Sequence, residues 1–230
     1  MVNPTSFNTK MNSNQQRIVI CGTDTDIGKT IVSALFVLGL NACYWKPIQS
    51  GLDDGSDSMR ISKILNLSKE QIISELYKFQ APVSPHWSAE KENQWINPDV
   101  IKLPLTKGPL VIETAGGLMV PLNRSYLQID LLEQWNLPVI LVARSGLGTL
   151  NHTLLSLEAL KKRNIPILGI ILNGKLHEDN PKTLKQFGKV PIIAELPPLI
   201  EISGKMLKEQ WEKQQLQIIF NRLYEDLKGS

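Results

Sequence analysis

The sequence predicts an α/β fold in which a mostly parallel sheet is covered by helices on both faces. Two observations support this prediction. Short apolar segments alternate with helical stretches along most of the 230 residues, and such alternation is typical of right-handed crossovers between parallel strands. The hydrophobic content of 42% is also high enough for one substantial buried core.

Six segments are expected to be strands. Each is nearly continuous in apolar residues, as expected of strands that are covered on both faces. The expected strands are Arg17–Cys21, Ala42–Lys46, Leu110–Glu113, Pro138–Ala143, Ile167–Leu172 and Pro191–Glu195.

Helical stretches lie between and after these strands. The expected helices are Lys29–Leu40, Ser56–Leu65, Lys69–Leu76, Leu127–Gln134, Thr149–Arg163, Pro181–Phe187 and roughly Gly204–Leu227. The proline-containing stretch Phe79–Pro98 is expected to be a loop, which either shapes a substrate pocket or is a plain surface excursion. In such folds, ligands bind beyond the carboxyl ends of the strands.

Composition limits the partners and the domain organisation. We expect a flexible polar tail over residues 1–16 and a single domain over residues 17–230. The formal net charge of +3 is too small to indicate a nucleic-acid partner, and no apolar run is long enough to span a membrane. Cys21 and Cys43 lie outside any metal-ligand spacing, which predicts buried free thiols in the reducing cytoplasm.

The first expected strand runs into the loop Gly22-Thr-Asp-Thr-Asp-Ile-Gly-Lys-Thr30, and a helix follows. Backbone N–H groups in such a loop and at a helix N-terminus face the oxygens of a triphosphate. Lys29 would neutralise phosphate charge, Gly28 lets the backbone approach closely, and the Thr30 hydroxyl can ligate Mg²⁺. The match to G-x-x-x-x-G-K-[ST] is imperfect, because Thr23 stands at the first glycine. The intact Gly-Lys-Thr between strand and helix still predicts a P-loop NTPase-like fold that binds ATP.

Two acidic residues are candidate Mg²⁺ ligands beside Thr30. Glu113 ends an apolar strand, and Asp57 lies in a polar turn before a helix. Mg²⁺ prefers a few hard oxygens together with phosphate and water. Structural roles remain open at this point, because Glu113 could cap a strand–loop junction and Asp57 could stabilise a helix N-terminus.

Lys46 ends the second expected strand and is predicted to face the same crevice. A fixed positive charge at this place would stabilise an anionic acyl or phosphoryl intermediate. The alternative is a solvated lysine whose aliphatic stem covers the strand end.

Taken together, these segments resemble the dethiobiotin synthetase family of biotin biosynthesis. The family's Gly-Thr-Asp-Thr-x-x-Gly-Lys-Thr loop is intact at Gly22–Thr30. The further matches are Lys-Pro-x-x-Ser-Gly at Lys46–Gly51, Ser-Pro-His at Ser84–His86, Glu-x-Ala-Gly-Gly at Glu113–Gly117, Leu-Pro-Val-Ile-Leu-Val at Leu137–Val142 and Leu-Gly-x-x-Asn-His at Leu147–His152. The matches extend over Arg17–Leu199.

The resemblance implies an ATP-dependent ligase. Such enzymes convert 7,8-diaminopelargonic acid, CO₂ and MgATP to dethiobiotin, ADP and phosphate. A carbamate and a carbamic–phosphoric anhydride are the implied intermediates. Alternatives are a partitioning or positioning ATPase of the same class, another amide- or urea-forming ligase, and a non-catalytic nucleotide-binding regulator.

The resemblance also implies roles for individual residues. Lys46 and Lys29 would be catalytic, and Thr30, Asp57 and Glu113 would surround Mg²⁺. The residues implied to bind nucleotide are Asp26, Ile27, Gly28, Lys29, Thr30, Ile31, Asp57, Glu113, Thr114, Ala115, Gly116, Asn173, Gly174, Pro197, Pro198 and Leu199. The residues implied to bind the diamine substrate are Ser50, Leu147, Gly148 and Asn151, of which the last three would come from the partner subunit of a homodimer.

Three positions depart from the family pattern. Thr114 replaces the usual glycine after Glu113, Arg144 stands where small or apolar residues are usual, and Glu201–Lys205 does not align well. Thr114 supplies the same backbone N–H, so we expect little loss there. The segment Glu201–Lys205 corresponds to the family's nucleoside-contacting end, so its poor alignment bears on the preference for ATP over other triphosphates.

Overall fold

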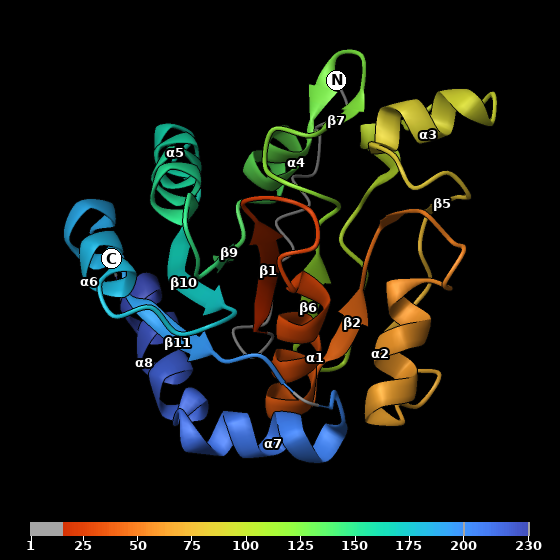
Figure 1. The fold of residues 1–230 in the computed structure, drawn as a ribbon. Coiled ribbons are helices and arrows are strands. Elements are labelled where there is room, and N and C mark those ends of the chain that lie inside the picture. Colours follow the sequence, from red (N-terminus) through yellow and green to blue (C-terminus); the bar gives the residue numbers. More distant parts are fainter. Residues whose placement is uncertain (1–15, 200, 230) are drawn as a thin grey trace, which may run out of the picture.

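The computed structural model describes residues 16–199 and 201–229, and its centre is a seven-stranded parallel sheet (Figure 1). The strand order is β11-β10-β9-β1-β6-β2-β4. These strands are β1 (Arg17–Gly22), β2 (Cys43–Trp45), β4 (Ile72–Ile73), β6 (Leu110–Glu113), β9 (Val139–Arg144), β10 (Ile167–Asn173) and β11 (Ile192–Leu196). The predicted α/β class with a mostly parallel sheet is therefore confirmed.

Helices cover both faces of this sheet, each over its own apolar core. One core contains Leu35, Trp211 and Phe220, and the other contains Leu132 and Leu157. The helices are α1 (Lys29–Leu40), α2 (Asp57–Leu65), α3 (Pro85–Lys91), α4 (Gln128–Trp135), α5 (Thr149–Lys162), α6 (Asn180–Gly188), α7 (Gly204–Lys213) and α8 (Leu216–Gly229), with one 3-10 turn at Pro98–Val100. Among the described helices, none is long and apolar enough to cross a membrane.

Two small sheets lie beside the main one. β3 (Ile48–Ser50) pairs in parallel with β5 (Tyr77–Phe79), and β7 (Pro121–Asn123) pairs with β8 (Tyr126–Leu127) in the antiparallel sense. The β3–β5 pair fixes the chain that follows β2, because β3 begins only three residues after the last residue of β2. The polar turn at residues 51–56 then leads into α2.

Most predicted elements end within one residue of the observed ones, but Lys69–Leu76 is not a helix. The segment instead contains β4, where Ile72 and Ile73 pair with Tyr44 and Trp45 of β2. The β-branched Ile-Ile pair suits a strand, and pairing at the free edge of β2 outweighs the helical pattern of the flanking residues. The prediction was wrong because that edge is visible only in three dimensions.

Two further predictions need correction. The expected loop Phe79–Pro98 contains α3, whose first residue is Pro85, a favoured position for proline in a helix. The expected helix Gly204–Leu227 is two helices, separated where Gln215 adopts a left-handed φ of 53°. That conformation stops a helix.

The two thiols differ in exposure. Cys21 is fully buried in β1 and Cys43 is half-buried at the start of β2, so only the first matches the expected burial. Both are free thiols. The expected tail, residues 1–16, lies outside the described residues except for Gln16.

At the outer edge of β11, a side chain takes the place of a further strand within the part of the chain that the structure describes. The Gln214 side chain accepts a hydrogen bond from the Glu195 backbone N–H at 3.1 Å and donates one to the Glu195 carbonyl at 3.0 Å. Gln214 is the residue that follows α7. The C-terminal helices are thereby joined to the sheet edge.

Candidate active site

A cavity of about 790 Å³ opens at the carboxyl ends of β1, β2 and β6, beside the start of α1. The sequence-predicted residues that line it are Asp26, Gly28, Lys29, Thr30, Ile31, Lys46, Ser50, Asp57, Glu113, Ala115 and Gly116. Thr25, Gly51, Ser84 and Pro85, which lie in the matched family motifs but had no predicted role, also line it. So do residues outside those motifs or at their unspecified positions, namely Gln49, Asp53, Asp54, Gly55, Arg60, Pro82, Val83 and Val120. The polar turn between β3 and α2 was the only signal for several of these.

The phosphate loop arches from β1 over the start of α1 (Figure 1). Gly28 has a φ of 93°, which is the left-handed region and favours glycine. A Cβ atom at this position would overlap the Asn173 side chain. Asn173 in turn donates a hydrogen bond to the Ile27 carbonyl at 2.9 Å. The last residue of β10 therefore contacts the phosphate loop directly and stabilises its conformation.

Lys29 and Lys46 both line this cavity. Both residues are buried, with exposed fractions of 7% for Lys29 and 6% for Lys46. The Lys29 ammonium donates to the Asp24 carbonyl at 2.6 Å. The Lys46 ammonium forms ion pairs with Asp57 and with Glu113, the latter at 3.2 Å. The two predicted cations thus lie on one cavity.

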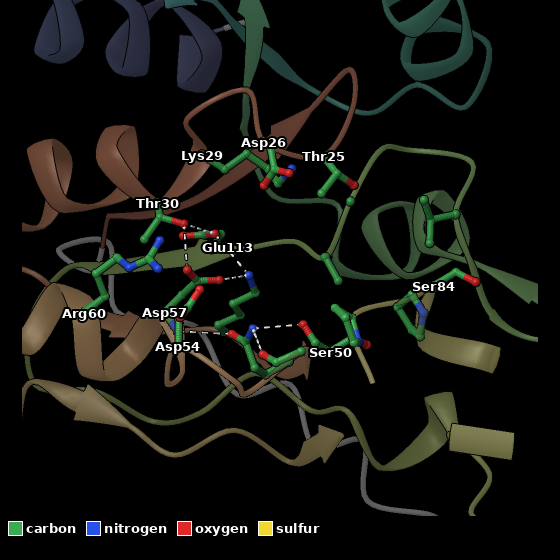
Figure 2. A pocket seen from close by; sticks show the side chains of 18 of the residues that line it. Thr25, Asp26, Lys29, Thr30, Ser50, Asp54, Asp57, Arg60, Ser84 and Glu113 are labelled. Atoms are coloured by element: carbon green, nitrogen blue, oxygen red, sulfur yellow. Dashed lines mark hydrogen bonds and ion pairs between the residues drawn. The ribbon is translucent and has the colours of Figure 1, made fainter. Parts of the chain in front are cut away.

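Thr30, Asp57 and Glu113 come together from three elements, as Figure 2 shows. The Thr30 hydroxyl lies 3.1 Å from an Asp57 oxygen and 2.9 Å from a Glu113 oxygen. The Tyr44 hydroxyl donates to the other Glu113 oxygen at 2.9 Å. Glu113 is only 1% exposed, so this buried carboxylate is held on both sides by hydroxyl groups.

These contacts change the acid–base properties of the site. Burial lowers the pKa of the Lys29 ammonium, against the opposing charge of Glu113. Burial also acts to lower the pKa of Lys46, but the charges of Glu113 and Asp57 outweigh it and raise that pKa overall. Burial acts to raise the pKa of Asp57, but the Lys46 charge and the hydrogen bonds from Lys46 and Thr30 lower it. Lys46 is therefore a cation and Asp57 an anion at neutral pH.

The donor atoms of this cluster fit Mg²⁺. Among the residues that the structure describes, no three His, Cys, Asp or Glu side chains form a metal site by themselves. Thr30, Asp57 and Glu113 offer one hydroxyl and two carboxylates, all of them hard oxygen donors. Mg²⁺ in proteins is commonly held by one or two carboxylates, with phosphate and water completing its shell.

Other predicted site residues do not line this cavity. Ile27 and Thr114 are buried, and Gly174 donates its N–H to the Leu196 carbonyl at 2.9 Å. The remaining residues that the described structure leaves outside the cavity lining are Leu147, Gly148, Asn151, Asn173, Pro197, Pro198 and Leu199. Leu147, Gly148 and Asn151 are exposed around the start of α5.

Arg144, the departure from the family pattern after β9, contacts the phosphate loop. Its guanidinium forms an ion pair with the Asp24 carboxylate at 2.9 Å. Both side chains are 49% exposed, so the pair is solvated and its contribution to stability is small.

Comparisons with known proteins show which family this chain belongs to. A family model described as an AAA domain matches residues 16–206. The ATP-dependent dethiobiotin synthetase BioD of Brucella ovis is 44% identical over 197 residues, which cover 86% of this chain and 93% of that protein. The biotin biosynthesis bifunctional protein BioCD of Bordetella avium is 44% identical over 198 residues, and the match covers 86% of this chain and 42% of that longer protein.

Among solved structures, a ParA family ATPase from Chlorobium tepidum superposes with a TM-score of 0.57 at 16% identity, covering 93% of this chain and 99% of that one. At this identity, the likeness shows the fold alone. The fold therefore does not distinguish a dethiobiotin synthetase from a partitioning ATPase. Sequence identity over most of both chains separates the two classes. The chain belongs to the family of ATP-dependent dethiobiotin synthetases.

Proposed function

We propose that the cavity forms the cyclic urea of dethiobiotin from 7,8-diaminopelargonic acid, CO₂ and ATP. One substrate amine adds to CO₂ and loses a proton, which gives a carbamate. A carbamate oxygen then attacks the γ-phosphorus of ATP, which gives a carbamic–phosphoric anhydride and ADP. The second amine attacks the anhydride carbonyl carbon, phosphate leaves with the C–O electron pair, and loss of a proton gives the neutral ring.

The single observation that carries this proposal is that Lys29 and Lys46 line the same cavity. The carbamate and the γ-phosphoryl group are both anions, so fixed cations are needed to bring them together. Lys46 would hold the carbamate, because its raised pKa keeps the ammonium charged. Lys29 would bridge the carbamate and ATP from the phosphate loop.

The phosphate loop and the acidic cluster would bind MgATP. Backbone N–H groups over residues 26–31 suit the phosphates. Asn173, Gly174 and residues 197–199 would bind the nucleoside. Thr30, Asp57 and Glu113 would hold Mg²⁺, which neutralises phosphate charge when it is bound. Ala115 and Gly116 line the cavity next to Glu113, and the main chain of Thr114 joins them.

Ser50 suits the diamine or its carbamate. Its hydroxyl oxygen is buried and has no hydrogen-bond partner among the described residues, although the residue lines the cavity. A buried hydroxyl without a partner is costly. A substrate nitrogen or oxygen at this place would satisfy it.

The proposal is tested by the product and by the requirements for ATP turnover. Purified protein, MgATP, diaminopelargonic acid and ¹³C-bicarbonate should give a cyclic urea that carries one ¹³C atom, detected by mass spectrometry. Release of phosphate should require both the diamine and bicarbonate. Turnover of ATP alone, stimulated by DNA or lipid, would contradict the proposal and favour a partitioning ATPase.

We also propose that the active enzyme is a cytoplasmic homodimer in which Leu147, Gly148 and Asn151 meet the substrate carboxylate in the partner's cavity. The exposed start of α5 supports this, because free N–H groups at a helix N-terminus suit a carboxylate. Mixing inactive Lys46→Ala chains with chains that carry Asn151→Asp should restore partial turnover, since one of the two cavities then has both native sides. If a verified mixed dimer shows no turnover, the proposal is contradicted, and each site is complete within one chain.

A further inference from the structure

Gln49 is a buried polar residue at the cavity that the sequence motif leaves unspecified. It directly precedes Ser50 in the chain and is 6% exposed. Gln49 belongs to β3, whereas Asp57 begins α2. The turn that joins these elements includes the exposed residues Asp53 and Asp54.

The side-chain amide of Gln49 makes three hydrogen bonds across the base of this turn. Its oxygen accepts a bond from the Asp57 backbone N–H at 3.2 Å. Its nitrogen donates to the carbonyls of Ser50 and Gly51, both at 3.2 Å. Figure 2 shows Ser50 on the same cavity as Asp57 and Glu113.

The bond from the Asp57 N–H fixes the start of α2. A helix leaves its first N–H groups without partners inside the helix. The Ser56 hydroxyl accepts one of them, from Met59 at 3.3 Å, and Gln49 accepts the one from Asp57. The first residue of α2 therefore has a fixed backbone, and this residue supplies the carboxylate that contacts Lys46 and Thr30.

The two donated bonds hold Ser50 and Gly51, which form the substrate loop. Gly51 has a φ of 80°, a left-handed conformation that favours glycine. The Gln49 amide fixes the orientation of the Ser50 and Gly51 carbonyls. The position of the buried Ser50 hydroxyl follows from this arrangement.

We propose that Gln49 is a positioning residue that couples the substrate loop to the metal-binding start of α2. The proposal rests on the proposed function, in which Ser50 meets the substrate and Asp57 binds Mg²⁺. The amide acts through these two residues and takes no part in the chemistry. Loss of supporting hydrogen bonds around metal ligands commonly lowers metal affinity or activity about 10–100-fold.

Two substitutions separate the two sides of the amide. Gln49→Met keeps the length of the side chain and removes all three hydrogen bonds. Gln49→Glu keeps an acceptor for the Asp57 N–H but loses both donors. Gln71→Met is the matched control, because the Gln71 amide also makes two side-chain bonds, at 3.3 and 3.4 Å, but lies outside the cavity.

The readouts are nucleotide binding by calorimetry, with and without Mg²⁺, and the KM for the diamine. In Gln49→Met, we expect the Mg²⁺-dependent gain in ATP affinity to fall about tenfold and the KM for the diamine to rise about tenfold. In Gln49→Glu, we expect only the KM to change, with ATP affinity in Mg²⁺ within about threefold of the wild type. Gln71→Met should match the wild type in both.

The outcomes decide the proposal. Wild-type ATP affinity and KM in Gln49→Met would overturn it. Equal losses of ATP affinity in Gln49→Met and Gln49→Glu, together with a lowered melting temperature in both, would also overturn it. If the wild type forms no cyclic urea, the proposed function fails. The calorimetric comparison of Gln49→Met with the wild type then still tests the coupling to the Mg²⁺ ligand, because it needs no turnover.

Discussion

At the residue scale, Lys46 stands out because one ammonium group contacts two carboxylates of the cavity. The Asp57 and Glu113 carboxylates hold it in its charged form. A cation with this burial is positioned before any ligand arrives, so little reorganisation accompanies charge development in the reaction.

Replacing Lys46 by alanine should remove catalysis but not nucleotide binding. Loss of one preorganised charge contact at a reacting anion typically costs about 10²–10³-fold in kcat, and we expect at least that loss for Lys46→Ala. ATP affinity, measured by calorimetry, should stay within about tenfold, since the phosphate loop is unchanged. The exposed Lys78→Ala variant serves as the control, and wild-type turnover in Lys46→Ala would remove Lys46 from the mechanism.

Asp57 predicts a dependence of stability on pH. Its pKa in the folded protein is lower than its ordinary value of 3.8, so the unfolded chain takes up the proton first as the pH falls. The stability that the Asp57 carboxylate contributes is therefore complete well above 3.8 and is lost as the pH falls through the folded-state pKa.

Urea unfolding of the nucleotide-free protein measures this effect. The wild type should exceed Asp57→Asn by about 1–3 kcal/mol in free energy of unfolding at neutral pH, and the difference should close in acid. A difference that stays constant from neutral pH into acid would show that the carboxylate charge is not the cause.

At the element scale, helix α1 joins the phosphate loop to the C-terminal helices. Phe36 of α1 and Trp211 of α7 meet edge to face, with ring centroids 5.2 Å apart. Gly39 lies under the same indole, where an added Cβ atom would overlap the Trp211 ring. The glycine permits this close contact near the end of α1.

Gly39→Ala should therefore destabilise the protein in spite of its better helix propensity. The gain from removing a helical glycine is at most about 1 kcal/mol, whereas overpacking a rigid ring costs about 1–3 kcal/mol. Thermal and urea unfolding measure the net loss. Gly108→Ala is the control, because a Cβ atom there meets nothing within 4 Å, and a stabilised Gly39→Ala would show that the helices separate without cost.

Most strands of the main sheet and the helices that cover it could be predicted from sequence, including β11 at one edge, while β4 at the other edge could not. Buried parallel strands such as Leu110–Glu113 are continuous in apolar residues, so their signal is local. β4 has only two residues, and its strand form depends on pairing with β2. Likewise, the phosphate loop and Lys46 follow from motif and position, but the role of Gln49 depends on contacts across a turn.

At the scale of the whole molecule, two apolar cores share one sheet. We propose that residues 17–230 form a single domain that unfolds in one transition, and that ATP and Mg²⁺ bind only the folded form. MgATP at 100 times its Kd would then stabilise the protein by about 2.7 kcal/mol, which corresponds to a rise of about 5–10 °C in melting temperature.

Differential scanning calorimetry measures this shift. The phosphate loop is its expected source, so Lys29→Ala should lose most of it, while Lys78→Ala should keep it. Two separate transitions, of which MgATP moves only one, would contradict the single-domain proposal.

The Gln214 contact with β11 has a consequence for how copies of this protein behave in crowded solution. Open sheet edges recruit strands from other molecules and so promote aggregation. On β11, a side-chain amide occupies the outward-facing N–H and carbonyl of Glu195, and at the opposite border β4 offers only two residues. A strand from another molecule therefore cannot pair with the Glu195 backbone groups, and at the other border it can pair with a strand of only two residues.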